Sequence, residues 1–213
     1  AHVVLNGRDK AKLERAQQAL AAAGRKASIA PFDVTDHEAV EAGVAMIEAE
    51  IGPIDILINN AGMQKRAPIT EFPVEGWHEV INTNLHSVFY VTQAVTKRMV
   101  PRKRGKIISI GSVMSELGRA TIIPYTASKG AVKMMTRGLA AELGKHNIQA
   151  NAIGPGYFAT EINAALIADE AFSSWVCSRT PAGRWGETKE LAGAAIFLSS
   201  AASDYVNGHL LMV

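Results

Sequence analysis

The stretch that decides the fold runs from residue 112 to residue 129 and reads Ser112-Val-Met-Ser-Glu-Leu-Gly-Arg-Ala-Thr-Ile-Ile-Pro-Tyr125-Thr-Ala-Ser-Lys129. The apolar run 106–110 before it is typical of a buried strand, and a long helical pattern follows it. Tyr125 and Lys129 are four residues apart, so they share one face of that helix. A lysine cation beside a phenol favours tyrosinate, so we expect the pKa of Tyr125 to fall from about 10, which suits a general acid or base. The pair alone is equally compatible with an exposed tyrosine over a surface lysine.

Apolar runs and helical patterns alternate along the whole chain. The runs are continuously apolar, which is typical of a parallel sheet covered on both faces. We therefore predict a doubly wound α/β fold of the Rossmann type, a single domain over residues 1–213, with ligands at the carboxyl ends of the strands. The expected strands are 2–5, 28–32, 54–58, 106–110, 148–153 and 210–213, and the expected helices are 9–24, 36–52, 74–100, 125–146 and 188–199.

Composition narrows the functional classes. The chain has 213 residues, of which 48% are hydrophobic, and a formal net charge of only +2, so we expect no nucleic-acid partner. The basic run 101–106 is interpreted as a solvated turn. Cys177 is the one cysteine, which excludes an internal disulfide framework and favours the cytoplasm. The six histidines are scattered and no apolar run is long enough to cross a bilayer, so we expect neither a metal site nor a membrane span.

Three further motifs accompany the opening stretch. Asn59-Asn60-Ala61-Gly62 closes the third apolar run, Asn84 lies within Asn82-Thr83-Asn84-Leu85, and Pro155-Gly156 follows the fifth run. In this order and spacing, and together with Ser112, Tyr125 and Lys129, they resemble the short-chain dehydrogenase/reductase family. The resemblance covers residues 1–213 and implies an NAD(P)-dependent oxidoreductase that acts on CH–OH groups.

The resemblance assigns catalytic roles to four residues. Ser112 would hydrogen-bond the reacting oxygen of the substrate, and Tyr125 would transfer its proton. Lys129 would lower the pKa of Tyr125 and bind the nicotinamide ribose. Asn84 would hold a water that relays protons toward Lys129, although taken alone it is typical of a polar residue on a helix flank.

The cofactor half of the site is implied by the segment Leu5-Asn6-Gly7-Arg8, where the family binds adenosine. A carboxylate there would accept a hydrogen bond from the ribose 2′-hydroxyl of NAD, whereas Gly7 leaves room for a 2′-phosphate that Arg8 can pair with. This favours NADP, with NAD as the alternative, because Arg8 can also stack on the adenine of either cofactor. The other cofactor-binding residues that the resemblance implies are Asn6, Asp33, Val34, Asn60, Ala61, Gly62, Tyr125, Lys129, Pro155, Gly156 and Thr160.

Residues 111–119, 154–158 and 180–186 resemble family members of the gluconate 5-dehydrogenase type, which interconvert D-gluconate and 5-keto-D-gluconate. A sugar acid needs a cation for its carboxylate and polar groups for its hydroxyls. The loop residues expected to supply them, beside Ser112, are Arg119, Glu116, Gln64 and Arg66. Both arginines are equally compatible with solvated loop charges. Other carbonyl substrates of the 3-ketoacyl, polyol or steroid type stay open, because the fold does not determine the substrate.

The resemblance also bears on the ends of the chain. Family members begin with a strand and a Gly-x-x-x-Gly-x-Gly turn that holds the pyrophosphate. Here the chain begins at what would be the second strand, and its final strand stops at Val213, so we expect the sequence to be truncated at both ends. If the chain is complete instead, a non-catalytic, dehydrogenase-like scaffold is the alternative.

Assembly is the last expectation. The predicted helices 74–100 and 125–146 carry apolar residues beyond one face, including Val88, Val91, Val95, Met134 and Met135. Family members usually pair these helices across two-fold axes, commonly as tetramers, so we expect a homotetramer, or at least a dimer.

Overall fold

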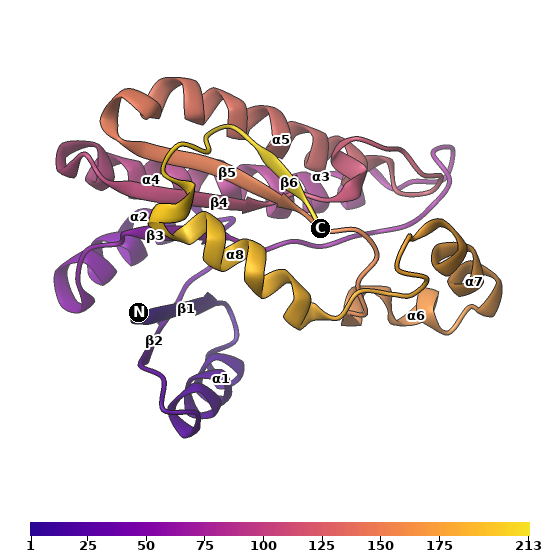
Figure 1. The fold of residues 1–213 in the computed structure, drawn as a ribbon, viewed down its shortest axis with the longest axis horizontal. Helices are drawn as coiled ribbons and strands as arrows, with labels where there is room; N and C mark the ends of the chain where they lie inside the picture. Colours follow the sequence, from indigo (N-terminus) through magenta and orange to yellow (C-terminus); the bar gives the residue numbers. More distant parts are fainter.

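Parallel strands alternate with helices along the chain (Figure 1). The computed structural model describes residues 1–213, except for the side chain of Ile162. The strands are β1 (Val3–Gly7), β2 (Ala27–Pro31), β3 (Ile56–Asn59), β4 (Gly105–Ile110), β5 (Ile148–Gly154) and β6 (Leu210–Met212). The helices are α1 (Lys10–Ala22), α2 (His37–Met46), α3 (Val74–Ile81), α4 (Ser87–Arg102), α5 (Ile123–Leu143), α6 (Ala164–Ile167), α7 (Glu170–Arg179) and α8 (Ala192–Ser199).

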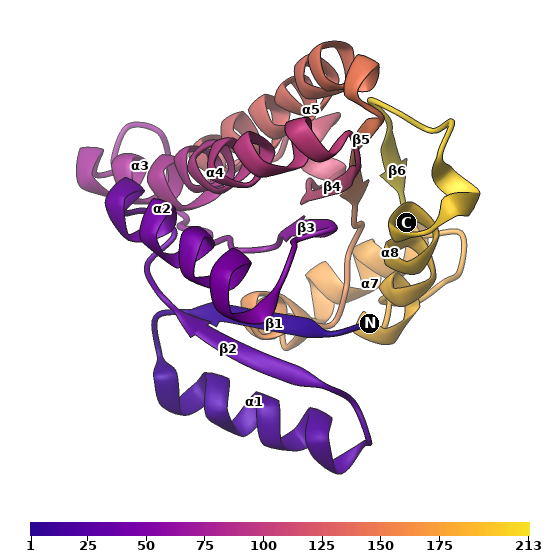
Figure 2. The ribbon, with the colours of Figure 1, turned by 90° about the vertical axis from the view of Figure 1, so that its left-hand side faces the viewer.

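The strands form two parallel ladders. One has the order β3-β4-β5-β6, and the other pairs β1 with β2. Figure 2 shows β1 and β2 lying beside the β3 edge, with α1 on their outer side. β1 and β3 do not pair with each other. The predicted α/β fold with a parallel sheet is confirmed, and its sheet is divided at this point.

The main sheet is buried on both faces. On one face, Val95 and Met99 of α4 and Val44 of α2 pack with Ile107 of β4. On the other face, Leu198 of α8 packs with the next residue of β4, Ile108 (Figure 2). Both faces of one strand therefore need apolar side chains, which explains the continuous run in the sequence. Burying such a side chain contributes roughly 1.5–3 kcal/mol.

The predicted long helix 74–100 is interrupted. Residues Asn82–His86 form a π-helical turn between α3 and α4, and Asn84 lies buried inside it. Val88 and Val95 of α4 are also buried, so the expectation that they project beyond the core-facing side of the helix was wrong. Their apolar character is explained by the sheet on which α4 packs. π-turns occur frequently at functional sites, because the extra residue displaces backbone groups from the regular ladder.

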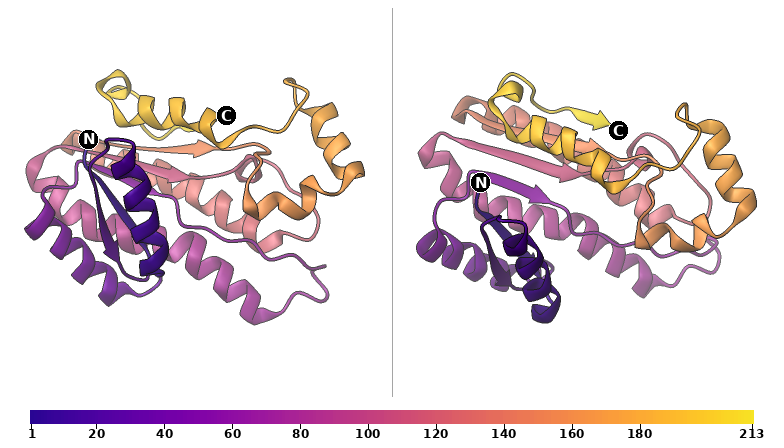
Figure 3. Two further views of the ribbon diagram at one scale, coloured as in Figure 1. Left: turned by 90° about the horizontal axis from the view of Figure 1, so that it is seen from below. Right: turned by 60° about the horizontal axis from the view of Figure 1, so that its bottom comes forward.

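Two helices between β5 and α8 were missed by the sequence patterns. α6 and α7 lie beyond the carboxyl end of β5 (Figures 1 and 3). α7 begins after Asp169, whose carboxylate accepts a hydrogen bond from the N–H of Phe172 at 3.0 Å. Phe172 of this helix packs edge-on against Tyr157 and tilted against Trp185, and Trp175 packs edge-on against Tyr157. The aromatic cluster, defined as these four residues, holds α7 beside the strand ends.

Candidate active site

Ser112 lies directly beyond the end of β4. Its Oγ accepts a hydrogen bond from the N–H of Met114 at 3.1 Å, which caps a short 3₁₀ turn. The next residue, Val113, donates its N–H to the carbonyl of Pro155 at 2.8 Å. The loop after β4 is thereby fastened to the loop after β5, and Ser112 is held at the carboxyl edge of the sheet.

Tyr125 and Lys129 occupy the first turns of α5, and the structure brings them together as predicted. Nζ of Lys129 lies 5.6 Å from the centre of the Tyr125 ring. The ammonium donates a hydrogen bond to the carbonyl of Ile110 at 2.6 Å, and only 4% of Lys129 is exposed. This bond connects α5 to the end of β4 and sets the distance between the helix and Ser112.

The expected lowering of the Tyr125 pKa was wrong. Burial raises the pKa of the Tyr125 phenol above its ordinary value, and the Ser112 hydroxyl offsets this only in part. Burial also lowers the pKa of Lys129 to about 8. Desolvation thus disfavours the charged forms of both residues, the tyrosinate and the ammonium. The phenol is therefore protonated at neutral pH and able to donate a proton.

Asn84 connects three segments through its side chain. Its Oδ1 accepts a hydrogen bond from the N–H of Met63 at 2.8 Å. Its Nδ2 donates to the carbonyl of Met63 at 2.9 Å and to Oγ of Ser128 at 3.1 Å. Both amide donors are thus used by the protein. The role of Asn84 in holding a relay water stays a prediction, and what the structure adds is that Asn84 fixes the segment after β3 against α5.

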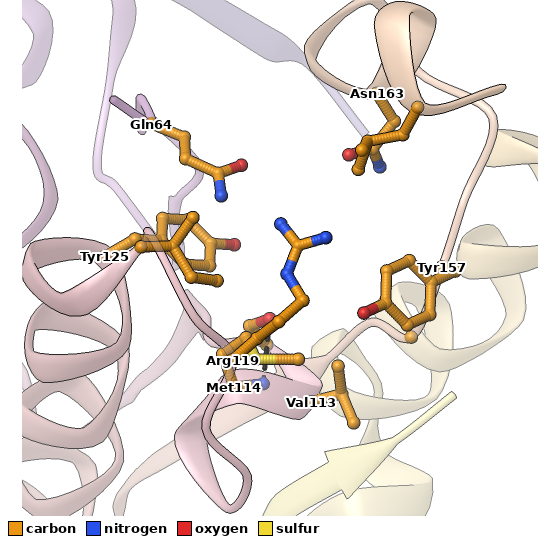
Figure 4. Close-up of a pocket in the computed structure, with 11 residues that line it drawn as sticks. Gln64, Val113, Met114, Arg119, Tyr125, Tyr157 and Asn163 are labelled. Carbon is orange, nitrogen blue, oxygen red and sulfur yellow. Dashed lines mark hydrogen bonds between the residues drawn. The ribbon is translucent and has the colours of Figure 1, made fainter. Parts of the chain in front are cut away.

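A pocket opens in front of Ser112 and Tyr125 (Figure 4). Gln64 and Arg119 line it, as expected for substrate-binding residues. Glu116 does not line it and forms an ion pair with Lys133 at 2.7 Å instead. The sequence patterns missed the other lining residues, although the Pro155-Gly156 motif pointed to the position of Tyr157, which follows it directly. These residues are Val113, Met114, Ile122, Tyr157, Asn163 and Leu166.

Arg66 is exposed and lies outside the residues that line the pocket. The pKa of its guanidinium is lowered by desolvation and, secondarily, by the positive charge of Arg119. The positive charges of these two arginines, which are widely separated in the sequence, therefore act on each other.

The predicted adenosine-binding residues gather at the ends of β1 and β2. Nη1 of Arg8 lies 3.6 Å from a carboxylate oxygen of Asp33, and 79% of the Arg8 side chain is exposed. The pKa of Asp33 is lowered, chiefly by the hydrogen bond it accepts from the N–H of Thr35. Asn6 donates to the carbonyls of Ala30 and Phe32, at 2.9 and 3.1 Å. The Asp33 carboxylate, which Thr35 holds in place, thus positions Arg8, and the Arg8 guanidinium remains accessible to an anion.

The other predicted cofactor residues follow the carboxyl ends of their strands. Val34 follows β2, the Asn60-Ala61-Gly62 run follows β3, and Pro155, Gly156 and Thr160 follow β5. A Cβ atom added to Gly62 would lie 3.8 Å from Nζ of Lys129 and 3.6 Å from Oδ1 of Asn84. The run after β3 therefore passes beside Lys129 and Asn84, with space that a small residue leaves open.

Metal ligands and membrane spans were also sought. The side chains that the structure describes contain no group of three or more histidine, cysteine, aspartate or glutamate residues arranged to hold a metal ion. No helix in the described chain is long and apolar enough to cross a membrane.

Known proteins with similar sequences place this geometry in context. The family model described as enoyl-(acyl carrier protein) reductase matches residues 1–213. Gluconate 5-dehydrogenase of Gluconobacter oxydans is 58% identical over 213 residues, which are 100% of this chain and 83% of that protein. 5-Keto-D-gluconate 5-reductase of Escherichia coli K12 is 57% identical over 100% of this chain and 84% of its own length. The chain belongs to the short-chain dehydrogenase/reductase family.

A solved structure agrees with this assignment. Gluconate 5-dehydrogenase from Burkholderia cenocepacia, in complex with NADP and tartrate, matches this short-chain dehydrogenase/reductase with a TM-score of 0.98 and 52% identity. The match covers 100% of this chain and 84% of that one. The expected Rossmann-type fold and the expected oxidoreductase class, acting on CH–OH groups, are confirmed.

The protonated Tyr125 of this short-chain dehydrogenase/reductase gives a testable pH dependence. Alcohol oxidation needs a deprotonated phenol, so its rate should rise with pH and still be rising at about pH 10, the ordinary pKa of tyrosine.

Tyr125→Phe should lower kcat about 100-fold or more, because the transferable proton is gone while the ring still packs. Steady-state kinetics from neutral to alkaline pH measure both effects. The exposed Tyr205 supplies the control, Tyr205→Phe. Near-normal turnover by Tyr125→Phe would reject Tyr125 as the proton donor.

Proposed function

We propose that this enzyme transfers a hydride between NADP and a hydroxy or keto sugar acid, and that it interconverts D-gluconate and 5-keto-D-gluconate. The observation that carries the proposal is that Arg119 lines the same pocket as Ser112 and Tyr125. A carbonyl held by the serine and the tyrosine would thus have a cation within the same pocket. The two relatives at 58% and 57% identity, named for gluconate and 5-keto-D-gluconate, support this substrate.

The roles of the chain's own residues follow from the geometry. Ser112 and Tyr125 both present a hydroxyl to the pocket, so one substrate oxygen can accept hydrogen bonds from both. Tyr125 donates its proton to a carbonyl that is being reduced and accepts a proton from an alcohol that is being oxidised. Lys129 lies beside the phenol with a pKa of about 8, which suits it to return that proton near neutral pH. NADP, when bound, supplies or accepts the hydride.

The residues at the sheet edge fit a dinucleotide. Arg8, with its exposed guanidinium, would pair with the 2′-phosphate, and Asp33 and Val34 would border the adenine. The run Asn60-Ala61-Gly62 would line the adenosine side. Pro155, Gly156 and Thr160 would lie near the carboxamide and the phosphates. The NADP found in the Burkholderia cenocepacia structure supports NADP over NAD.

Substrate identity is tested by mixing the purified protein with NADPH and 5-keto-D-gluconate and following the loss of NADPH absorbance. We expect turnover with this keto acid, and the reverse reaction with D-gluconate and NADP⁺. The Tyr125→Phe protein serves as the background control. Turnover of a 3-ketoacyl thioester or a steroid ketone, without turnover of the sugar acid, would reject the proposed substrate.

Cofactor choice is tested at Arg8. Arg8→Ala should weaken the binding of NADPH about 10- to 100-fold while changing that of NADH little, because only NADPH carries a 2′-phosphate for the charge-assisted contact. Fluorescence titration of each reduced cofactor measures the two constants. Arg15→Ala, which changes an exposed arginine on α1, is the matched control. Equal losses for both cofactors would show that Arg8 contacts a part that they share.

We also propose that the enzyme is a homotetramer, and that it works in the cytoplasm, where its single cysteine stays reduced. Phe89 of α4 and Met134 of α5 are large, exposed apolar residues on the two helices. A hollow between these helices is lined by Phe89, Met135 and Leu139, among others. Light scattering should give a tetramer mass, and Met134→Glu should reduce it by placing charge in an apolar contact. A monomer mass for the unchanged protein would contradict this assembly.

A further inference from the structure

Three buried side-chain atoms have no hydrogen-bond partner among the residues that the structure describes: Nε of Arg119, the hydroxyl oxygen of Tyr157 and Oγ1 of Thr126. Of these three residues, Arg119 and Tyr157 line the pocket that contains Ser112 and Tyr125. Folded proteins satisfy nearly all buried polar groups, and exceptions call for a ligand, an ion or water. The two groups thus mark the part of the pocket where a polar ligand group is needed.

The charge around these atoms specifies the sign of that group. Among the described side chains, neither Arg119 nor Arg66 forms an ion pair with a carboxylate. Glu116, only three residues before Arg119, pairs with Lys133 instead. The nearby charge of Arg119 lowers the pKa of Arg66, after desolvation. Arg119 therefore lines the pocket with a positive charge that no carboxylate compensates, which favours an anion as its ligand.

The aromatic cluster holds both groups in place. The guanidinium carbon of Arg119 lies 5.1 Å from the centre of the Phe172 ring. Tyr157 meets Phe172 edge-on at 5.7 Å and Trp185 edge-on at 5.6 Å. In Figure 4 the guanidinium of Arg119 extends into the pocket between Tyr125 and Tyr157. A donor fixed by packing loses less freedom when it binds a ligand, which increases its contribution to affinity.

We propose that Arg119 and Tyr157 bind the carboxylate of the substrate, with Arg66 adding positive charge, and that they make the enzyme select a sugar acid over the corresponding neutral sugar. The inference rests on the proposed function and adds the orientation of the substrate to it. The carboxylate end lies against the aromatic cluster, and the carbon that is oxidised or reduced lies at Ser112 and Tyr125. Tyr157 is thereby a specificity-determining residue.

Equilibrium binding separates this role from catalysis. D-Gluconate and D-glucitol differ only in a carboxylate against a CH₂OH group, and each is titrated calorimetrically into the protein saturated with NADPH, to which an alcohol cannot pass a hydride. Arg119→Gln should weaken gluconate binding about 10- to 150-fold, the range for a hydrogen bond to a charged group, and leave glucitol binding unchanged. Tyr157→Phe removes a neutral donor to the same carboxylate and should weaken gluconate binding about 10-fold or more, because the acceptor is charged. Arg119→Lys keeps the positive charge but not the planar set of guanidinium donors. Gluconate should therefore bind this variant more tightly than Arg119→Gln and less tightly than the unchanged protein.

The control is Arg179→Gln. Arg179 also stacks on the aromatic cluster, with its guanidinium carbon 5.4 Å from the Trp175 ring centre, but it does not line the pocket. Its substitution should leave gluconate binding unchanged. Unaltered NADP⁺ affinity in every variant shows that the fold is intact. Equal losses for gluconate and glucitol in Arg119→Gln, or no loss for either, would overturn the proposal.

Turnover distinguishes this inference from the proposed function. The neutral counterpart of 5-keto-D-gluconate is L-sorbose, in which CH₂OH replaces the carboxylate. The unchanged enzyme should prefer the acid in kcat/KM, and Arg119→Gln should lose most of that preference through KM. If the unchanged enzyme reduces the acid and Arg119→Gln retains the preference, the carboxylate assignment alone fails. If the unchanged enzyme reduces neither compound, the proposed function fails with it.

Discussion

The arrangement of the site depends on the burial of one ammonium group. Lys129 gives up nearly all of its hydration, and the carbonyl of Ile110 is the acceptor that compensates it. That carbonyl belongs to the last residue of β4, so the bond fixes the start of α5 over the end of the strand from which Ser112 emerges. The cost of burying the charge appears as a pKa of about 8. A lysine in this state can exchange a proton near neutral pH, which an exposed lysine cannot do efficiently.

The parallel sheet concentrates the chemistry at one edge. Because all strands of the main ladder run in the same direction, the loops after β3, β4 and β5 meet at their carboxyl ends. A hydrogen bond from Val113 to Pro155 joins the loops after β4 and β5, and two hydrogen bonds between Asn84 and Met63 join the loop after β3 to the π-turn. Leu166 of α6 lines the pocket, and α7 packs against the lining residue Tyr157 through the aromatic cluster. The residues that line the pocket thus come from several elements, which is how one fold serves many substrates.

The sequence predicted the fold and the central residues because both are recorded in local patterns. Continuous apolar runs identified the strands, and the spacing of Tyr125 and Lys129 placed them on one helix face. The direction of the Tyr125 pKa was missed, since spacing reveals a neighbouring charge but not the loss of water that opposes it. Tyr157 was missed because its role depends on packing with Phe172 and Trp185, which are distant in the chain. The burial of Val95 likewise depends on which face of α4 the sheet covers.

The π-turn at Asn82–His86 has a consequence for how this chain can change length. An α-helix advances about 100° per residue, so one extra residue rotates everything after it by that angle. The turn therefore rotates the apolar face of α4 relative to that of α3. As a result α3 packs against α5 while α4 packs against the sheet. Removing a single residue there would turn the apolar stripe of α4 away from Ile107 and draw Asn84 away from Met63. The π-turn therefore sets the rotation of α4 about its axis relative to α3. Insertions or deletions are tolerated far better in the surface loops on either side of it.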